Sequence, residues 1–209
     1  MTPAPRPHVV AHVAISLDGA TTGFTPAVGR FYALAGTWRE DVTLAGADTI
    51  LAQEQALRAA PRPGPAAGGP LLAVVDGRSR VREWDALRDV GHWSGVLALR
   101  TSDSSDRGDG VAQLVAGTGR VDLAAALAAL AREHAARTVR VDSGGSLIGA
   151  LLDAGLLDEV SLLVHPLLAG TRGDRVWHGH AEAARVLEPV AAETLEDGLV
   201  WLRYRVPPA

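Results

Sequence analysis

The 209-residue sequence contains no cysteine and no lysine. Without cysteine the chain has no disulfide framework, no thiolate metal site and no cysteine nucleophile, which is compatible with a cytoplasmic protein. Its arginines are scattered along a chain of net charge -4, which argues against a nucleic-acid-binding surface. No apolar run approaches the roughly 20 residues that span a bilayer, and the opening MTPAPRPH lacks the core of a signal peptide. We therefore expect a cytoplasmic protein with neither membrane nor nucleic acid as a partner.

What the chain does contain is ordinary for a globular protein. Its 47% hydrophobic and 21% charged residues suit one soluble domain or two small ones. We expect a single domain over residues 1–209, which begins with a flexible proline-rich leader at 1–7. The segment at 60–70 is rich in proline and glycine and is predicted to be a loop rather than a linker, because the same pattern of elements continues beyond it.

Strand-like and helix-like segments alternate along the chain. Strands are predicted in the segments 8–19, 41–46, 71–77, 95–101, 111–117, 138–142 and 158–170, and helices at 29–40, 47–57, 83–91, 122–136 and 146–155. The tail at 185–206 is predicted to be a hairpin around a Glu-Asp-Gly turn. This alternation indicates an α/β fold, with a mostly parallel central sheet flanked by helices and an antiparallel C-terminal hairpin at one edge.

Two strand-to-helix turns are rich in small residues. Gly144 and Gly145 would let backbone N–H groups approach an oxyanion, and Ser146 is placed to cap the following helix. Gly46 and Thr49 form a second turn of this kind. Any such corner needs glycine and an N-cap simply to be built, so each alone favours a purely structural interpretation. Two corners at the same end of one sheet make a dinucleotide site more plausible, although neither the Rossmann nor the P-loop motif is present.

Four ordered blocks carry a family resemblance. AISLDG, DVTLAGADTIL, VDSGGSLIGALLDAGLLDEV and HPLLAG together resemble the pyrimidine reductase domain of riboflavin biosynthesis, in the dihydrofolate-reductase-like superfamily, from about residue 8 to residue 206. The resemblance implies a sheet of eight or nine strands, NADPH as cofactor, and hydride transfer to a pyrimidine or pterin-like substrate. It also implies a homodimer.

The resemblance and the turns together give a set of candidate site residues. Asp142 matches the substrate-facing glutamate common in the family, and His12 stands on a strand where its near-neutral titration suits proton delivery, although a half-buried histidine without a role is equally compatible. The candidate cofactor-binding residues are Ala14, Ile15, Gly46, Thr49, Gly77, Arg78, Ser143, Gly144, Gly145, Ser146, Leu147 and Ile148. Arg78, with Arg80 beside it, is a candidate for the 2′-phosphate of NADPH, or else a solvated loop residue.

Departures from the family pattern concern the substrate side. The stretch TTGFTPAVGRF stands where such reductases usually carry SGESxW, and His12 stands where they tend to have lysine. The resemblance therefore implies a rebuilt pocket, and Arg30, Tyr32 and Trp38 are candidates to line it. Asp18 is expected to be a turn residue, and the histidines of WHGH at 177–180 lack a third ligand in a recognisable motif, so no metal site is expected.

These observations predict an NADPH-dependent oxidoreductase. Its substrate would be a small heterocycle of pyrimidine or pterin type, or a related imine or conjugated carbonyl. Two alternatives stay open from the sequence: reduction of a riboflavin-pathway aminopyrimidine, and a non-catalytic nucleotide-binding or assembly module.

Overall fold

The structure is a computed structural model that describes residues 6–105, 108, 110–179, 181 and 184–208. The chain divides into two compact units, which we describe separately. The first unit comprises residues 1–7 and 40–139, and the second comprises residues 8–39 and 140–209. Most of the proline-rich leader, residues 1–5, lies outside the described residues.

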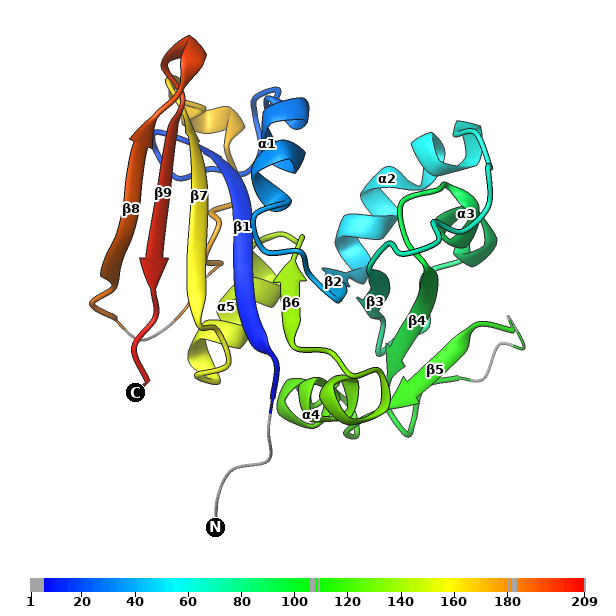
Figure 1. The fold of residues 1–209 in the computed structure, drawn as a ribbon. Coiled ribbons are helices and arrows are strands. Elements are labelled where there is room, and N and C mark those ends of the chain that lie inside the picture. The colour runs from blue at the N-terminus through cyan, green and yellow to red at the C-terminus, as the bar shows by residue number, and fades with distance from the viewer. Residues whose placement is uncertain (1–5, 106–107, 109, 180, 182–183, 209) are drawn as a thin grey trace. The chain divides into compact units, whose positions relative to one another are not determined.

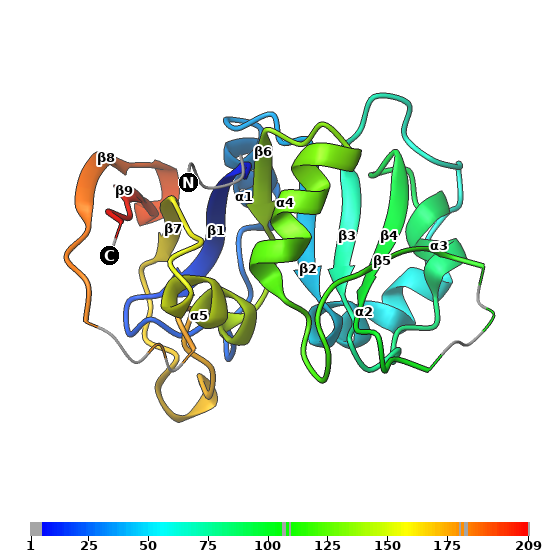
Figure 2. The ribbon, with the colours of Figure 1, turned by 90° about the horizontal axis from the view of Figure 1, so that it is seen from below.

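The first unit is built on parallel strands. Along the chain it contains β2 (Val42–Gly46), α2 (Ala47–Ala59), β3 (Leu71–Val75), α3 (Trp84–Asp89), β4 (Gly95–Arg100), β5 (Ala112–Val115) and α4 (Leu123–Glu133). The strands lie side by side in the order β5-β4-β3-β2, and each neighbouring pair is parallel (Figure 2). Residues of α2 and α3, among them Ile50, Trp84 and Leu87, share a hydrophobic core with Leu72 and Val74 of β3. Burial of β3 and β4 explains their continuous apolar sequences.

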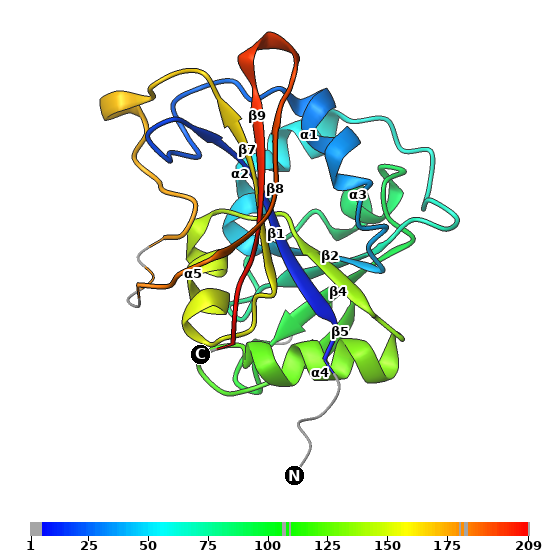
Figure 3. The ribbon, with the colours of Figure 1, turned by 60° about the vertical axis from the view of Figure 1, so that its left-hand side comes forward.

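The second unit combines parallel and antiparallel pairing. It contains β1 (His8–Ser16), α1 (Val28–Ala35), α5 (Gly145–Asp153), β7 (Glu159–His165), β8 (Glu188–Thr194) and β9 (Val200–Arg205), and the short 3-10 turns 170–172 and 196–198. Strand β6 (Thr138–Val141) straddles the boundary between the units. The order here is β6-β1-β7-β9-β8, in which β7 is parallel to β1 and antiparallel to β9 (Figure 1). The hairpin of β8 and β9 runs along β7 (Figure 3).

This architecture confirms the predicted α/β class, with nine strands that are mostly parallel and a C-terminal antiparallel hairpin. The Glu-Asp-Gly turn of the hairpin has positive φ at Asp197 (61°) and Gly198 (73°). The helix predicted at 29–40 ends earlier, at Ala35, because the amides of Gly36 and Thr37 close a final turn on Tyr32 and Leu34. The single-domain organisation stays a prediction. Among the described residues, no helix has the length and apolar character needed to cross a membrane.

Candidate active site

The turn between β6 and α5 is the glycine-rich stretch that the sequence singled out. Gly144 is the N-cap residue of α5, in an extended conformation (φ -75°, ψ 172°), and no side chain caps the helix. The prediction that Ser146 caps α5 is wrong, because the helix already begins at Gly145 and Ser146 lies in its first turn. By contrast, the Asp122 carboxylate caps α4 by accepting from the Ala125 amide. The start of α5 therefore presents first-turn amides and the positive end of a helix without a side-chain cap.

The two glycines of this turn differ in their surroundings. A Cβ at Gly145 would lie 2.5 Å from the amide nitrogen of Gly179, and one at Gly149 would lie 2.7 Å from the carbonyl oxygen of His178. A Cβ at Gly144 would meet no atom within 4 Å. Gly145 and Gly149 thus let the 176–179 loop approach α5 closely, whereas Gly144 leaves open space at the helix start.

The neighbours of these glycines limit how a cofactor could be held. Leu147 and Ile148 are buried, at 9% and 0% exposure, so their side chains belong to the core and only their backbone can face a ligand. Ser143 is partly buried and Ser146 is exposed. On β1, Ala14 is partly buried, and Ile15 is buried with its carbonyl accepting from His165 at 3.2 Å.

Asp142 follows β6 directly and lies in a polar cluster. Arg140 Nη1 donates to Asp142 Oδ2 at 3.1 Å, and the Arg140 side chain is only 5% exposed, against 27% for Asp142. Burial of the Tyr32 hydroxyl, and next the negative charge of Asp142, raise the pKa of Tyr32 to about 12. Tyr32 therefore stays neutral.

Two histidines of the sheet contact α1. The Ala27 amide, at the N-cap of α1, donates to Nε2 of His165 at 2.9 Å. Because Nε2 is the acceptor, Nδ1 carries the proton, and it lies 3.2 Å from the carbonyl oxygens of Ile15 and Leu163. His12 contacts the carbonyl oxygen of Phe31 through Nε2 at 2.9 Å. These bonds fix α1 beside β1, as seen in Figure 1.

His12 is buried, with 1% exposure, and stacks on Phe31 at 4.2 Å between ring centroids. Its Nδ1 lies 2.9 Å from Ser161 Oγ, which accepts from Trp201 Nε1 at 2.8 Å. Since Phe31 O can only accept, Nε2 carries a proton, and the Ser161 hydroxyl is then free to donate to Nδ1. The contacts hold the ring between Ser161 and Phe31, and it is more deeply buried than the sequence suggested.

The other two candidate substrate residues have different partners. Arg30 donates to Glu196 of the hairpin turn at 3.1 Å. Trp38 lies with its ring 5.2 Å from that of His12, and the Arg203 guanidinium is 5.3 Å from its centroid. Of the three residues proposed to line the pocket, only Tyr32 has a pKa that the charge of Asp142 raises.

Asp18 follows β1, and its carboxylate makes hydrogen bonds beyond its own turn. It accepts from Ser16 Oγ at 2.5 Å and from the amides of Ala169 and Gly170 at 3.0 and 2.9 Å. The hydrogen bond from Ser16, followed by those from Ala169 and Gly170, lowers the pKa of Asp18 to about 2. The sequence predicted only local backbone bonds, but the carboxylate ties the loop after β1 to the loop after β7.

The first unit contains the second predicted turn. Gly46 is the N-cap residue of α2, again without a side-chain cap, and Thr49 is partly buried in its first turn. Arg80 Nη1 lies 2.7 Å from Asp48 Oδ1, so the turns after β2 and β3 meet. The Gly77 carbonyl accepts from Ser104 Oγ at 2.8 Å. Arg78 is exposed beside Gly77.

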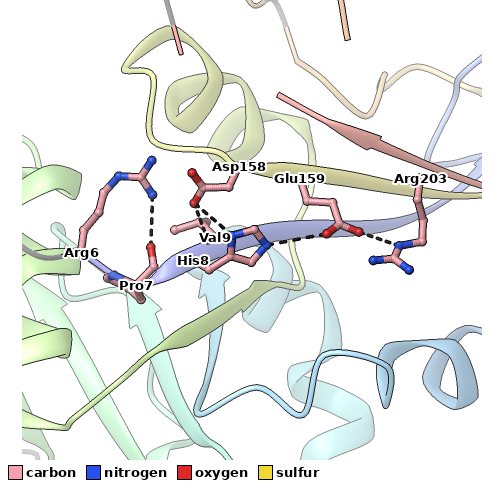
Figure 4. Close-up of polar contacts among 7 residues, drawn as sticks. All are labelled: Arg6, Pro7, His8, Val9, Asp158, Glu159 and Arg203. Atoms are coloured by element: carbon pink, nitrogen blue, oxygen red, sulfur yellow. Dashed lines mark hydrogen bonds and ion pairs between the residues drawn. The ribbon is translucent and has the colours of Figure 1, made fainter. Parts of the chain in front are cut away.

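A further polar cluster, made of His8, Asp158, Glu159 and Arg203, lies at the N-terminal ends of β1 and β7 (Figure 4). Arg203 Nε donates to Glu159 Oε1 at 2.6 Å, and His8 lies 3.8 Å from Asp158 and 3.7 Å from Glu159. Burial would raise the pKa of Glu159, but the contact with His8, the hydrogen bond from Arg203 and the charge of Arg203 outweigh it and lower the pKa to about 2.

In the part of the chain that the structure describes, no group of three or more histidine, aspartate or glutamate side chains could hold a metal ion. His178 of the WHGH stretch contacts Trp177 edge-on, at 5.2 Å between ring centroids. His180 lies outside the described residues.

Comparison with known proteins identifies the family. The family model described as the RibD C-terminal domain matches residues 7–201. The chain belongs to this family. Among curated proteins, this RibD C-terminal domain chain is 30% identical over 188 residues to the 2,5-diamino-6-ribosylamino-4(3H)-pyrimidinone 5′-phosphate reductase of Methanothermobacter thermautotrophicus, over 81% of this chain and 82% of the relative.

Solved structures show the same fold at lower identity. A pyrimidine reductase-like protein from Corynebacterium diphtheriae has a TM-score of 0.74 at 17% identity, over 97% of this chain and 93% of the other. The Saccharomyces cerevisiae riboflavin biosynthesis reductase Rib7 has a TM-score of 0.71 at 19% identity, over 97% and 90%. Both confirm the fold that the sequence resemblance implied.

Sequence reasoning missed several residues of the site. Arg140 lies on β6 two positions before Asp142, which directly follows the strand, so the period of two could have placed both on one face. His165 lies in the HPLLAG block but was given no role, because the amide it accepts from is 138 residues away. Ser161 carries no sequence signal beyond its place opposite His12 in the register.

Proposed function

We propose that this protein is an NADPH-dependent reductase that transfers hydride to a pyrimidine or a closely related heterocycle. The match to the RibD C-terminal domain over residues 7–201 carries the proposal. The archaeal relative, a pyrimidinone phosphate reductase, supports reductase chemistry on a pyrimidine. This support favours an enzyme over a non-catalytic module.

The cofactor assignment is supported by the two helix starts. Both α5 and α2 begin at a glycine N-cap without a side-chain cap, and a helix start favours phosphate. In the second unit, Gly144 leaves space that a Cβ would fill. In the first unit, exposed Arg78 is our candidate for the 2′-phosphate, because Arg80 is already paired with Asp48. The nicotinamide would supply the hydride, and the protein would orient it and exclude water.

The substrate side is assigned to Asp142. An ionised carboxylate accepts N–H groups, which an amino-substituted pyrimidine offers. For His12, the sequence suggested proton delivery. That role stays a prediction, because its buried ring and its contacts with Ser161 and Phe31 support a role in holding α1.

We further propose a cytoplasmic homodimer without a nucleic-acid partner. The absence of cysteine and the net charge of -4 support the location and the lack of nucleic acid. The dimer rests on the family resemblance.

The test is turnover by the purified protein. NADPH or NADH is mixed with the pyrimidinone phosphate named for the archaeal relative, a dihydropterin, an imine or an enone, and cofactor oxidation is followed by absorbance. We expect oxidation of NADPH with the pyrimidine. D142N should lower kcat/KM by about 100-fold, since a hydrogen bond to a charged group contributes about 1.5–3 kcal/mol. D197N, in the hairpin turn where asparagine tolerates positive φ, is the matched control and should retain activity.

Two results would contradict the proposal. Binding of NADPH without oxidation in the presence of any of these compounds would favour the non-catalytic module. Absence of binding by either nicotinamide cofactor would exclude both functions.

A further inference from the structure

The loop after β1 and the loop after β7 are joined to each other in the second unit. We call residues 17–24 the β1 loop and residues 169–179 the strap. The Arg175 carbonyl oxygen accepts from both the amide and the hydroxyl of Thr21, at 2.8 and 3.2 Å. Three further contacts join the two segments: the antiparallel bridge of Ala20 with Val176, the bond from Thr22 Oγ1 to Asp174 Oδ1 at 2.7 Å, and the bond from the Trp177 amide to the Gly19 carbonyl oxygen at 3.3 Å.

Glycines let the strap approach two neighbours closely. A Cβ at Gly23 would lie 2.6 Å from the Arg172 carbonyl oxygen, so the backbone of the β1 loop touches the strap there. Gly145 and Gly149 likewise bring α5 against the end of the strap. The strap is therefore in contact with both the β1 loop and α5, and a displacement of the strap would change the surroundings of the α5 start.

Asp18 holds the beginning of the strap. The Ser16 hydroxyl donates to its carboxylate from the end of β1, and the amides of Ala169 and Gly170 donate to it at 3.0 and 2.9 Å. The bond from Ser16 and then the two amide bonds lower the pKa of Asp18 to about 2, so the carboxylate is ionised at neutral pH. Most of residues 171–175 are exposed, and exposed segments open locally at low cost in free energy. The anchor at the start of the strap therefore decides how often it opens.

We infer that Asp18 is a positioning residue, which joins the strap to the β1 loop and keeps it docked against the start of α5, where the cofactor phosphate is proposed to bind. This inference rests on the proposed reductase function and adds a requirement to it: the cofactor binds the form of the protein in which the strap is docked. Docking and binding are then thermodynamically linked, so NADPH stabilises the docked strap, and loss of the anchor weakens NADPH binding. Thr22, which bonds to Asp174 further along the strap, is a second anchor.

The first test measures docking without requiring activity. The chain has no lysine, so trypsin cleaves it only after arginine, and Arg175 is exposed in the strap. Because the Arg175 carbonyl oxygen is bonded to Thr21, cleavage at this residue reports opening of the strap. Native protein is digested briefly, and the fragments are quantified by mass spectrometry. We expect cleavage at Arg175 to be about tenfold faster in D18N and several-fold faster in T22V, because cleavage follows the population of the open form.

D41N is the matched control for this test. The Asp41 carboxylate also accepts from two backbone amides, those of Arg137 and Thr138, at 2.7 and 2.9 Å, but it does so in the first unit. Its loss should leave cleavage at Arg175 unchanged, and circular dichroism confirms that each variant folds. Equal rates of cleavage in the wild type, D18N and T22V would overturn the inference, and T22V alone decides if D18N does not fold.

The second test measures the link to the cofactor. With NADPH at about ten times its Kd, cleavage of the wild type at Arg175 should slow about elevenfold, because a ligand that binds only the docked form depletes the open form in that proportion. The double variant D18N/T22V should raise the Kd for NADPH about tenfold and change kcat at saturating NADPH less than about twofold, whereas D41N should change neither.

Two results would overturn the link: an unchanged Kd in the double variant, or NADPH that binds the wild type without slowing cleavage at Arg175. Absence of binding by either nicotinamide cofactor in the wild type would instead refute the proposed function. In that case the digestion of D18N and D41N still decides whether Asp18 holds the strap.

Discussion

The two glycines of the β6–α5 turn should respond in opposite ways to the same substitution. In G145A, the new Cβ would lie 2.5 Å from the Gly179 amide nitrogen, which is a steric clash. The neighbour is backbone, so the 176–179 loop must move. Overpacking costs about 1–3 kcal/mol, and a backbone clash belongs at the upper end. For a chain of this length about 3 kcal/mol lowers Tm by about 6–12 °C.

In G144A, the Cβ meets nothing within 4 Å, and φ of -75° is accessible to alanine. Stability should be unchanged or about 0.5 kcal/mol higher, because alanine restricts the unfolded chain. The added methyl group would occupy the space proposed for a phosphate, so NADPH affinity should fall at least about tenfold, which is about 1.4 kcal/mol. Thermal unfolding and NADPH fluorescence measure the two effects.

Equal losses of stability in G144A and G145A would contradict the prediction, because the two sites would then not differ in the space around them. Unchanged NADPH affinity in G144A would contradict the phosphate site. The first outcome concerns the packing of α5, and the second concerns the phosphate site.

Three further predictions concern other residues. E159Q should lower the free energy of unfolding at pH 7 by about 1–2 kcal/mol after allowance for solvent screening. The folded-state pKa of Glu159, about 2, lies below the ordinary 4.5, so this stabilisation is present above pH 4.5 and is lost as pH falls toward 2. Denaturant unfolding of E159Q should therefore depend less on pH in that window than unfolding of the wild type. H165F removes the acceptor for the Ala27 amide and should cost about 1–3 kcal/mol, with faster hydrogen exchange at that amide; unchanged exchange would contradict the contact. R78A should weaken NADPH binding about tenfold and leave NADH unaffected, whereas R80A, with its arginine already paired to Asp48, should change neither; equal loss for both cofactors would refute the 2′-phosphate assignment.

The fold followed from local patterns in the sequence. Apolar runs such as 71–75 and 95–100 have strand length and are buried, and the helix at 123–133 has both a capping aspartate and an apolar stripe. These signals depend on residues close in the chain. The start of α5 was misplaced by one residue because glycine and serine both occur at helix caps, and only the backbone decides between them.

The site was predicted less completely, because its contacts join residues far apart in the chain. Tyr32 was singled out, yet Asp142, whose charge raises the pKa of Tyr32, is 110 positions away, and no local pattern links them. The packing of Gly145 against the 176–179 loop was not predicted, because that loop lies more than 30 residues further along the chain. Asp18 was taken for a turn residue for the same reason: its amide partners follow β7.

The central claim is that the protein moves hydride from a nicotinamide to a pyrimidine. NADPH carrying deuterium at the transferable C4 position is incubated with the protein and an aminopyrimidine substrate, and the product is analysed by mass spectrometry. The account predicts a reduced product that carries one deuterium from the cofactor, with much slower formation in D142N. A product without deuterium, or NADPH that stays bound and unoxidised, would contradict it.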